Sequence, residues 1–306
     1  MNQSSPVIPR RTLLAAAAAA SLAGCAKTRT ASPRPSLSVS PSASPSEVRH
    51  DGLITLETRF GARLGVYALA TGSGATVAHR ADERFAFCST FKALAAAAVL
   101  DRNPLSHLDT VVTYTAADLM KSSAVTKQHV STGMTIRQLC DAAVRYSDGT
   151  AGNLLLRDLG GPAELTAFAR GIGDPVTRMD RVEPGITTAI PGDERDTSSP
   201  RAFGGNFHKL VLGDALAAEQ RAILRDLLER NTTGARRIRA GLPQGWRVAD
   251  KTGTGDYGTV NDIAVVWPAT APPLVIAIMS SKPAADAAYD EALLAEATRY
   301  VVTTLM

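Results

Sequence analysis

The amino-acid sequence predicts an α+β fold in which one antiparallel sheet, flanked by helices, is assembled from both ends of the chain around a helical insertion. Three observations lead to this prediction. Strand-like segments stand near the start of the folded part, segments with helical spacing fill the middle, and strands followed by a long helix close the chain. The chain has 306 residues, 45% hydrophobic and 20% charged, so its composition is globular and its length is ample for a large core.

The first 25 residues are expected to be a signal peptide that is not part of the fold. Arg10 and Arg11 supply a positive start, and residues 13–23 form an apolar, alanine-rich stretch too short to span a bilayer. The stretch ends in Leu22-Ala23-Gly24-Cys25, which resembles the bacterial lipobox. Several acyl chains on Cys25 would anchor the protein stably to a membrane. An ordinary secretory signal with an incidental cysteine is the alternative.

The paired arginines also resemble a twin-arginine signal, which would mean export of an already folded protein. In either case we expect an extracytoplasmic protein that is attached to the membrane, or released from it in a soluble form. Residues 26–48 are rich in Ser, Pro and Thr and cannot bury a core, so they are expected to form an extended tether. The folded domain is then residues 49–306, with an α/β part (49–87 and 230–306) and a helical part (88–229).

The folded domain opens with a predicted β-hairpin. Residues 64–69 and 75–79 have strand patterns, and a turn rich in Gly and Ser joins them. The next pattern, over residues 85–100, contains a run of Ala and Leu with almost no polar face. Such a run predicts a central helix that other elements cover on all sides.

The rest of the chain continues with helices and then strands. Helical spacing occurs at residues 136–146, 150–159, 163–171, 203–212 and 217–230. Strand patterns occur at residues 246–251, 262–267 and 274–280, and a closing helix is expected at 286–305. Residues 178–200 have no periodicity and are rich in Pro, Gly, Asp and Thr. An irregular segment this long in a compact domain is more often functional than accidental, so we expect an Ω-type loop there.

Ser89 and Lys92 stand at the start of the predicted central helix. Residues three apart are neighbours on a helix surface, so the Lys92 amine can reach the Ser89 hydroxyl and, if burial lowers its pKa, accept its proton. The free N–H groups of a helix N-terminus can stabilise an oxyanion beside Ser89. A capping serine followed by a solvated lysine is the alternative interpretation of this pair alone.

Three further short motifs follow in order along the chain: Ser147-Asp148-Gly149, Arg181-Val182-Glu183-Pro184 and Lys251-Thr252-Gly253-Thr254. Together with the Ser-x-x-Lys of Ser89, they make the chain resemble the class A serine β-lactamases from about residue 49 to its end. The resemblance implies the two-part β-lactamase/transpeptidase-like fold. It also implies hydrolysis of the β-lactam amide of antibiotics through a serine acyl-enzyme.

The resemblance implies a role for each motif. Ser89 would be the nucleophile, Lys92 would orient and can deprotonate it, and Ser147 would relay a proton to the leaving nitrogen. Lys251 would attract the substrate's carboxylate. Two ammonium groups this close would lower each other's pKa, which favours a neutral, basic Lys92.

The same resemblance assigns a substrate-binding edge. The hydroxyls of Thr252 and Thr254 would bind the carboxylate, and the oxyanion would lie between the backbone N–H groups of Ser89 and Thr254. Arg237 matches a position where some family members carry an additional carboxylate-binding arginine. A solvated arginine on a helix surface is the alternative interpretation of Arg237.

Glu183 distinguishes two kinds of enzyme. A D-Ala-D-Ala carboxypeptidase or transpeptidase shares the serine and lysine motifs but stalls as an acyl-enzyme with β-lactams, as would a slow-turnover β-lactam-binding lipoprotein. A glutamate in the loop can activate a water for deacylation. Arg181 is expected to pair with Asp196 and clamp the two ends of this loop together.

Three positions refine the resemblance. Gly149 stands where the family mostly has Asn, so a side-chain amide contact to the substrate is missing. Thr187 replaces the Asn that usually helps Glu183 hold the hydrolytic water, and a hydroxyl can bond water with fewer donors. Asn153 matches an Asn on the helix after the relay serine that supports the site from behind.

The resemblance implies an enzyme that acts on small β-lactam molecules, and we expect it to be a monomer that needs no cofactor. The net charge of +4 is modest and no basic cluster interleaved with aromatics occurs, so nucleic acid is not an expected partner. The histidines lack metal-binding spacing, so no metal is expected. Relatives with disulfides pair the positions of Cys140 and Cys88 with positions that are Ala96 and Gly255 here, so we expect two free, buried thiols.

Overall fold

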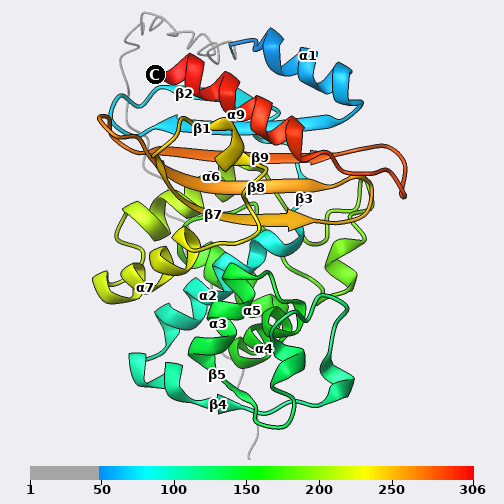
Figure 1. Ribbon diagram of the computed structural model, residues 1–306, viewed down its shortest axis with the longest axis vertical. Helices are drawn as coiled ribbons and strands as arrows, with labels where there is room; N and C mark the ends of the chain where they lie inside the picture. The colour runs from blue at the N-terminus through cyan, green and yellow to red at the C-terminus, as the bar shows by residue number, and fades with distance from the viewer. Residues whose placement is uncertain (1–47) are drawn as a thin grey trace, which may run out of the picture. The chain divides into compact units, whose positions relative to one another are not determined.

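A computed structural model describes residues 48–306 of the chain. Its centre is a five-stranded antiparallel sheet in the order β2-β1-β9-β8-β7. The strands are β1 (Arg63–Ala70), β2 (Thr76–His79), β7 (Arg247–Thr254), β8 (Val260–Trp267) and β9 (Leu274–Ser281). Figure 1 shows this sheet as a layer with helices on both faces. The predicted α+β class is confirmed.

The sheet joins the two ends of the domain. Strand β1 pairs with β9 from Arg63 opposite Ser281 to Ala70 opposite Leu274, so the early hairpin lies directly beside the C-terminal strands. The strands β8 and β9 are buried on both faces, except for their last residues. This burial explains why residues 263–267 of β8 and 274–279 of β9 are continuous apolar runs and not alternating patterns.

Helices α1 (Asp51–Phe60) and α9 (Glu291–Leu305) lie along one face of the sheet, as Figure 1 shows. Their apolar side chains, including Leu53 and Leu294, form a core with the side chains of that face. The sequence did not predict α1, because its helix rests on packing against α9 and not on a capping side chain. Helix α9 begins later than predicted because Asp290 caps it, accepting a hydrogen bond from the backbone N–H of Ala292 at 3.0 Å.

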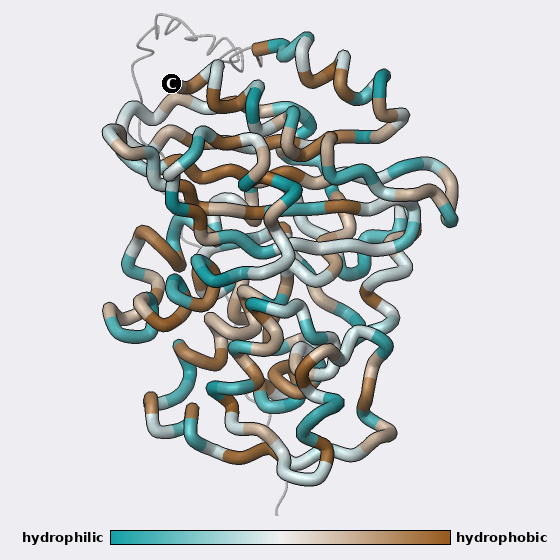
Figure 2. Tube along the Cα trace, viewed as in Figure 1, coloured by the Kyte–Doolittle hydropathy of each residue, from teal (hydrophilic) through white to brown (hydrophobic). Residues whose placement is uncertain are grey.

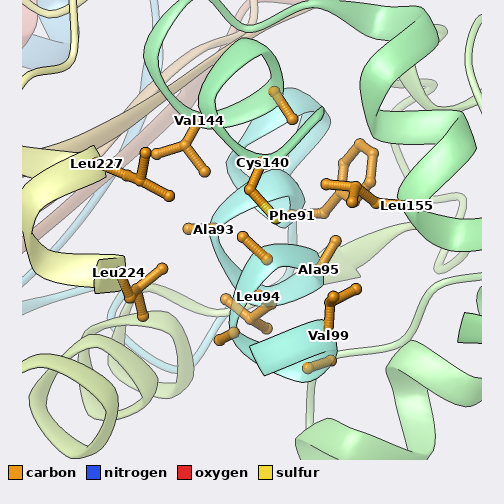
Figure 3. Packing of buried hydrophobic residues seen from close by; sticks show 14 of the residues in the cluster. Phe91, Ala93, Leu94, Ala95, Val99, Cys140, Val144, Leu155, Leu224 and Leu227 are labelled. Carbon is orange, nitrogen blue, oxygen red and sulfur yellow. The ribbon is translucent and has the colours of Figure 1, made fainter. Parts of the chain in front are cut away.

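The helical part lies on the other face of the sheet and surrounds α2 (Phe91–Arg102). The helices concerned are α3 (Ile136–Arg145), α4 (Gly149–Leu159), α5 (Pro162–Gly171), α6 (Pro200–Phe207) and α7 (Ala218–Glu229). Every residue of α2 from Phe91 to Leu100 is buried, which confirms the predicted central helix. In Figure 3, Leu224 and Leu227 of α7 approach α2 from one side and Leu155 of α4 from another. The alanines of α2 allow this close packing.

The remaining elements are short. Two-residue strands are β3 (Phe85–Ala86), β4 (Val111–Val112), β5 (Met134–Thr135) and β6 (Thr197–Ser198), paired as β3 with β6 and β4 with β5. A one-turn helix, α8 (Ile238–Gly241), precedes β7. Single 3₁₀ turns occur at Cys88–Thr90, Leu105–Asp109, Ala116–Asp118, Thr126–Gln128 and Gly185–Thr187, and a π-helical turn at His208–Leu212 extends α6.

Hydropathy along the chain follows this layering. Figure 2 shows hydrophobic residues concentrated on the sheet strands and on the inward sides of the helices, whereas the connecting loops are mostly hydrophilic. Within residues 48–306, no helix is both long enough and apolar enough to cross a bilayer. The predicted signal peptide, the acylation site at Cys25 and nearly all of the tether lie outside the described residues.

Candidate active site

Ser89 lies in the 3₁₀ turn Cys88–Thr90, directly before α2. Strand β7 runs close against this turn. A Cβ atom on Gly253 would lie 2.5 Å from the carbonyl oxygen of Phe87, so the approach requires glycine. On the neighbouring strand, the Asn261 Nδ2 donates to the same Phe87 oxygen at 3.2 Å. The turn that carries Ser89 is therefore attached to the sheet edge.

Lys92 lies one turn along α2, with its side chain fully buried. Its Nζ donates to the Ser89 Oγ at 2.8 Å and to the backbone oxygen of Ser147 at 2.8 Å, and lies 2.5 Å from Glu183 Oε1. Burial lowers the pKa of Lys92 from its ordinary value, while the neighbouring Glu183 carboxylate acts in the opposite direction. The alternative of a solvated surface lysine is wrong.

Glu183 reaches the same centre from the loop between α5 and α6. The Ser89 Oγ donates to Glu183 Oε1 at 3.3 Å. Asn153 on α4 holds the Glu183 backbone from both sides, since its Nδ2 donates to the Glu183 carbonyl at 3.0 Å and its Oδ1 accepts from the Glu183 N–H at 2.9 Å. A residue on a loop is thereby fixed to a helix.

The loop is closed by the expected ion pair. The Arg181 Nε lies 2.5 Å from the Asp196 Oδ2, and the Asp196 Oδ1 accepts from the backbone N–H groups of Asp180 at 2.8 Å and Arg181 at 2.9 Å. Asp196 is 1% exposed. Strand β6, which pairs with β3, follows Asp196 directly, so the ion pair joins the two ends of the loop and Arg181 is anchored two residues before Glu183.

Ser147 connects the two buried lysines. Its backbone oxygen accepts from Lys92, and its Oγ accepts from the Lys251 Nζ at 3.0 Å. Burial lowers the pKa of Lys251 well below its ordinary value, and the Lys92 ammonium adds to the shift. Burial is thus the largest cause for both lysines, and the mutual repulsion predicted from the sequence is a smaller cause that acts on Lys251.

Asp148, the middle residue of that motif, organises the loops around the site. It caps α4, its Oδ1 accepting from the Ala151 N–H at 2.9 Å, and its Oδ2 accepts from the N–H groups of Val125 and Thr126, both at 2.9 Å. The carboxylate is fully buried. Asp148 therefore fixes the loop before Thr126 relative to α4, a role that the sequence reasoning did not assign.

Arg237 is buried behind β7, with 5% of its surface exposed. Its Nη2 donates to the Thr254 Oγ1 at 2.8 Å, its Nη1 to the carbonyl of Gly253 at 2.9 Å, and its Nε to Glu291 at 3.0 Å. The alternative of a solvated surface arginine is wrong. Positive charge therefore stands beside Thr254 as well as at Lys251.

The other threonine of that motif has a different partner. The Thr252 Oγ1 lies 2.5 Å from the Thr233 Oγ1, and the Thr252 carbonyl accepts from the Lys251 Nζ at 3.0 Å. Thr252 thus helps to hold Lys251 through its backbone.

Two of the atypical positions have clear surroundings. Gly149 is the first residue of α4, and a Cβ atom there would lie 2.2 Å from Glu183 Oε2 and 2.3 Å from the Ser122 Oγ. The Thr187 Oγ1 donates to the Pro184 carbonyl at 2.8 Å, and no contact links this hydroxyl to Glu183 in the described part of the chain.

Ser122 was not predicted. It lies in an exposed loop without a recognisable motif, and its Oγ donates to Glu183 Oε2 at 3.0 Å. Only the tertiary structure brings the two together, 61 residues apart in the sequence.

The cysteines and possible metal ligands complete the site's surroundings. Cys88 and Cys140 are free and buried, as predicted, and burial raises the pKa of each thiol to about 12. Across residues 48–306, no group of three or more His, Cys, Asp or Glu side chains is arranged to hold a metal ion.

The site residues thus form one contiguous group. Direct contacts connect Ser89, Lys92, Glu183, Ser147 and Lys251. Supporting residues hold this group from the helices, the loop and the sheet edge. They are Asn153, Arg181, Asp196, Arg237 and Thr254.

Comparisons with known proteins identify the family that the chain is similar to. Residues 51–305 match the sequence model described as the beta-lactamase enzyme family. The chain is 53% identical over 304 residues to a beta-lactamase of Mycobacterium tuberculosis, with 97% of each chain covered. It is 58% identical over 250 residues to a beta-lactamase of Amycolatopsis lactamdurans, with 82% of this chain and 83% of the relative covered.

A solved structure is similar as well. The crystal structure of a beta-lactamase from Desulfarculus baarsii superposes with a TM-score of 0.82 at 50% sequence identity, and the match covers 83% of this chain and 96% of that chain.

Proposed function

The chain belongs to the beta-lactamase enzyme family, and from this membership we propose that it hydrolyses the β-lactam amide of antibiotics through an acyl-enzyme on Ser89. Hydrolysis of the drug protects the cell that makes the enzyme. The single observation that supports the complete cycle is the position of Glu183, whose Oε1 lies 3.3 Å from the Ser89 Oγ and 2.5 Å from the Lys92 Nζ.

The first half of the cycle is acylation. The Ser89 Oγ attacks the carbonyl carbon of the β-lactam and gives its proton to Lys92 or Glu183, both of which it contacts. When the C–N bond breaks, the ring nitrogen takes a proton from the Ser147 hydroxyl, which the Lys251 ammonium contacts and which is reprotonated through the lysines. The low pKa of Lys92, caused by burial, supports its role as a base.

The second half is deacylation. Glu183 removes a proton from a water molecule, and the water oxygen attacks the ester carbonyl carbon. The C–O bond to Ser89 breaks, the serine recovers its proton, and the ring-opened acid leaves. This step separates the proposed enzyme from a D-Ala-D-Ala peptidase, because a site without the glutamate retains the acyl group.

The carboxylate that β-lactams carry would bind at the edge of β7. Lys251 and Arg237 are the cationic side chains there, and the Arg237 guanidinium donates to the Thr254 hydroxyl on this edge strand. The backbone N–H groups of Ser89 and Thr254 would stabilise the oxyanion.

The test measures the pre-steady-state burst and the steady-state turnover of a chromogenic cephalosporin, for the wild type and for Glu183→Ala. We expect rapid turnover by the wild type, and an acyl-enzyme that accumulates in the variant. If the wild type stops after one equivalent, hydrolysis is not its function. Activity on a D-Ala-D-Ala peptide would then identify a peptidase, and its absence would identify a β-lactam-binding lipoprotein.

We also propose that the enzyme is exported, attached to the membrane through an acylated Cys25 and monomeric. The support is the charged and apolar pattern that precedes Cys25, followed by a tether rich in Ser and Pro. Mass spectrometry of the membrane fraction tests this proposal. Acyl chains on Cys25 are expected, and an unmodified, soluble N-terminus would contradict it.

A further inference from the structure

The two carboxylate oxygens of Glu183 have different partners. Oε1 contacts both the Ser89 Oγ and the Lys92 Nζ, the groups that take part in acylation. Oε2 accepts a hydrogen bond from the Ser122 Oγ at 3.0 Å, and among the described residues no other hydrogen-bond donor contacts it. Ser122 therefore holds the second oxygen, as Ser89 and Lys92 hold the first, and the two sets of contacts together orient the carboxylate about its last torsion angle.

The position of Ser122 is itself fixed. The Gly149 N–H donates to the Ser122 carbonyl at 2.7 Å, which attaches the loop to the first residue of α4. The next residue, Ser123, is buried, and its Oγ lies 2.6 Å from the Met120 carbonyl and 2.7 Å from the Thr150 Oγ1. The loop thus presents the Ser122 hydroxyl from a backbone held on both sides.

Gly149 makes the contact between Ser122 and Glu183 possible. A Cβ atom on residue 149 would lie within 2.3 Å of both the Ser122 Oγ and Glu183 Oε2, distances that real Cβ atoms do not show. Any other residue there would have to displace the hydroxyl, the carboxylate or both. The glycine and the serine are therefore two parts of one arrangement.

We propose that Ser122 is a positioning residue for deacylation, holding Glu183 Oε2 in the space that Gly149 leaves open. This inference rests on the proposed function, because it concerns the same glutamate. A hydroxyl that donates to the second oxygen of a general base keeps the first oxygen aimed at the reacting centre. The Ser122 hydroxyl does not touch Ser89 or Lys92, and Lys92 can accept the Ser89 proton during acylation through its own contact, so Ser122 acts on deacylation more than on acylation.

The first test separates the two chemical steps. For Ser122→Ala we expect the deacylation rate constant of a chromogenic cephalosporin to fall about tenfold, with the acylation rate constant changed less than about threefold. Ser122→Thr keeps the hydroxyl and should recover most of the lost rate. Equal losses in both steps, or no recovery with Thr, would overturn the proposal.

The matched control is Ser123→Ala. This variant also removes a hydroxyl from the loop, but one bonded to Met120 and Thr150 and not to Glu183. If the loop matters only as structure, Ser123→Ala should slow deacylation at least as much as Ser122→Ala. We expect instead that its effect on both steps is equal and small.

The second test examines the coupling of the two positions. Gly149→Ala should slow deacylation about 100-fold in the wild-type background but less than about tenfold in Ser122→Gly, because removal of the hydroxyl frees one of the two spaces that the new methyl group needs. Additive effects would contradict the coupling. If Gly149→Ala does not fold, as judged by circular dichroism, the comparison of Ser122→Ala with Ser122→Thr decides alone.

These outcomes are distinct from failure of the proposed function. A wild type that does not turn over the cephalosporin would overturn the function itself. A wild type with normal turnover, together with Ser122→Ala that deacylates normally, would overturn only the inference about Ser122.

Discussion

The two walls of the site are built differently. One wall is formed by strand β7, with Lys251 and Thr254, and by Arg237 directly before α8, and its two cationic side chains are buried with several partners each. The other wall is a loop, whose backbone is held by Asn153 and whose Glu183 carboxylate contacts the side chains of Ser89, Lys92 and Ser122. The difference implies that binding and acylation depend on a rigid frame, whereas deacylation depends on a few individual contacts.

The largest expected effect is on the loop wall. Glu183→Gln keeps the shape of the side chain but cannot accept a proton, so deacylation should fall about 10³-fold while the acyl-enzyme still forms. Mass spectrometry of the protein after brief exposure to a penicillin should show the added mass of the drug. Loss of acylation to the same extent would show that the two walls are not functionally separate.

A second effect tests how the loop wall is held. Asp196→Ala removes a buried carboxylate that pairs with Arg181 and accepts two backbone N–H groups, so the free energy of unfolding should fall by about 2–4 kcal/mol. Urea denaturation measures it. Arg195→Ala is the control, because it breaks an exposed pair on the same loop and should change stability by less than about 0.5 kcal/mol. If both variants lose the same free energy of unfolding, the burial of Asp196 does not contribute to the stability of the loop.

A third effect tests the sheet wall with two adjacent arginines that share Glu291. Arg237 is buried and bonded to Thr254, whereas the Arg236 side chain is 83% exposed. Arg237→Ala should lower kcat/KM for penicillins about 10- to 100-fold through acylation, with deacylation little changed. Arg236→Ala should leave kcat/KM within about twofold. A similar loss of kcat/KM in both variants would mean that penicillin acylation depends on net charge and not on the buried contact of Arg237 with Thr254.

The smallest effect concerns stability and pH. The unfolded chain holds the Lys251 proton up to its ordinary pKa of 10.5, and the folded protein releases it at lower pH, so the contribution of Lys251 to the free energy of unfolding rises with pH until about that value. Lys251→Met removes the free-energy cost of burying an amine whose pKa is lowered by folding. The variant should therefore be more stable than the wild type by about 1–3 kcal/mol at neutral pH. The difference should shrink as pH rises towards 10.5.

Thermal denaturation between pH 6 and pH 9 tests this prediction, with Lys127→Met on an exposed turn as the control. If the difference in stability between Lys251→Met and the wild type does not change with pH, the proton on Lys251 is not the cause of that difference.

Sequence patterns predicted the parts of the molecule that local chemistry determines. The apolar run of α2 and the order of the motifs around Ser89, Ser147 and Lys251 were sufficient for the fold and for the residues that meet at its centre. The ion pair between Arg181 and Asp196 was also visible, because the two lie at the ends of one irregular segment.

Other features depend on long-range packing and had no local signal. Helix α1 is held by α9, which lies more than 200 residues later in the chain. Ser122 contacts Glu183 from a loop without a motif, and the burial of Arg237 depends on β7 and α9 together. The dominant role of burial in shifting the two lysines likewise follows from packing, which charge patterns do not reveal.

The pairing of β1 with β9 has a consequence for biosynthesis. These strands lie at opposite ends of the domain, so the sheet closes only after almost the whole chain has left the ribosome, and contacts of such large sequence separation form slowly. Ser89 meets β7 only in that closed sheet. Covalent labelling by a fluorescent penicillin should therefore appear late in refolding and report its completion. Before that point the new chain is exposed to proteases and cannot hydrolyse a β-lactam.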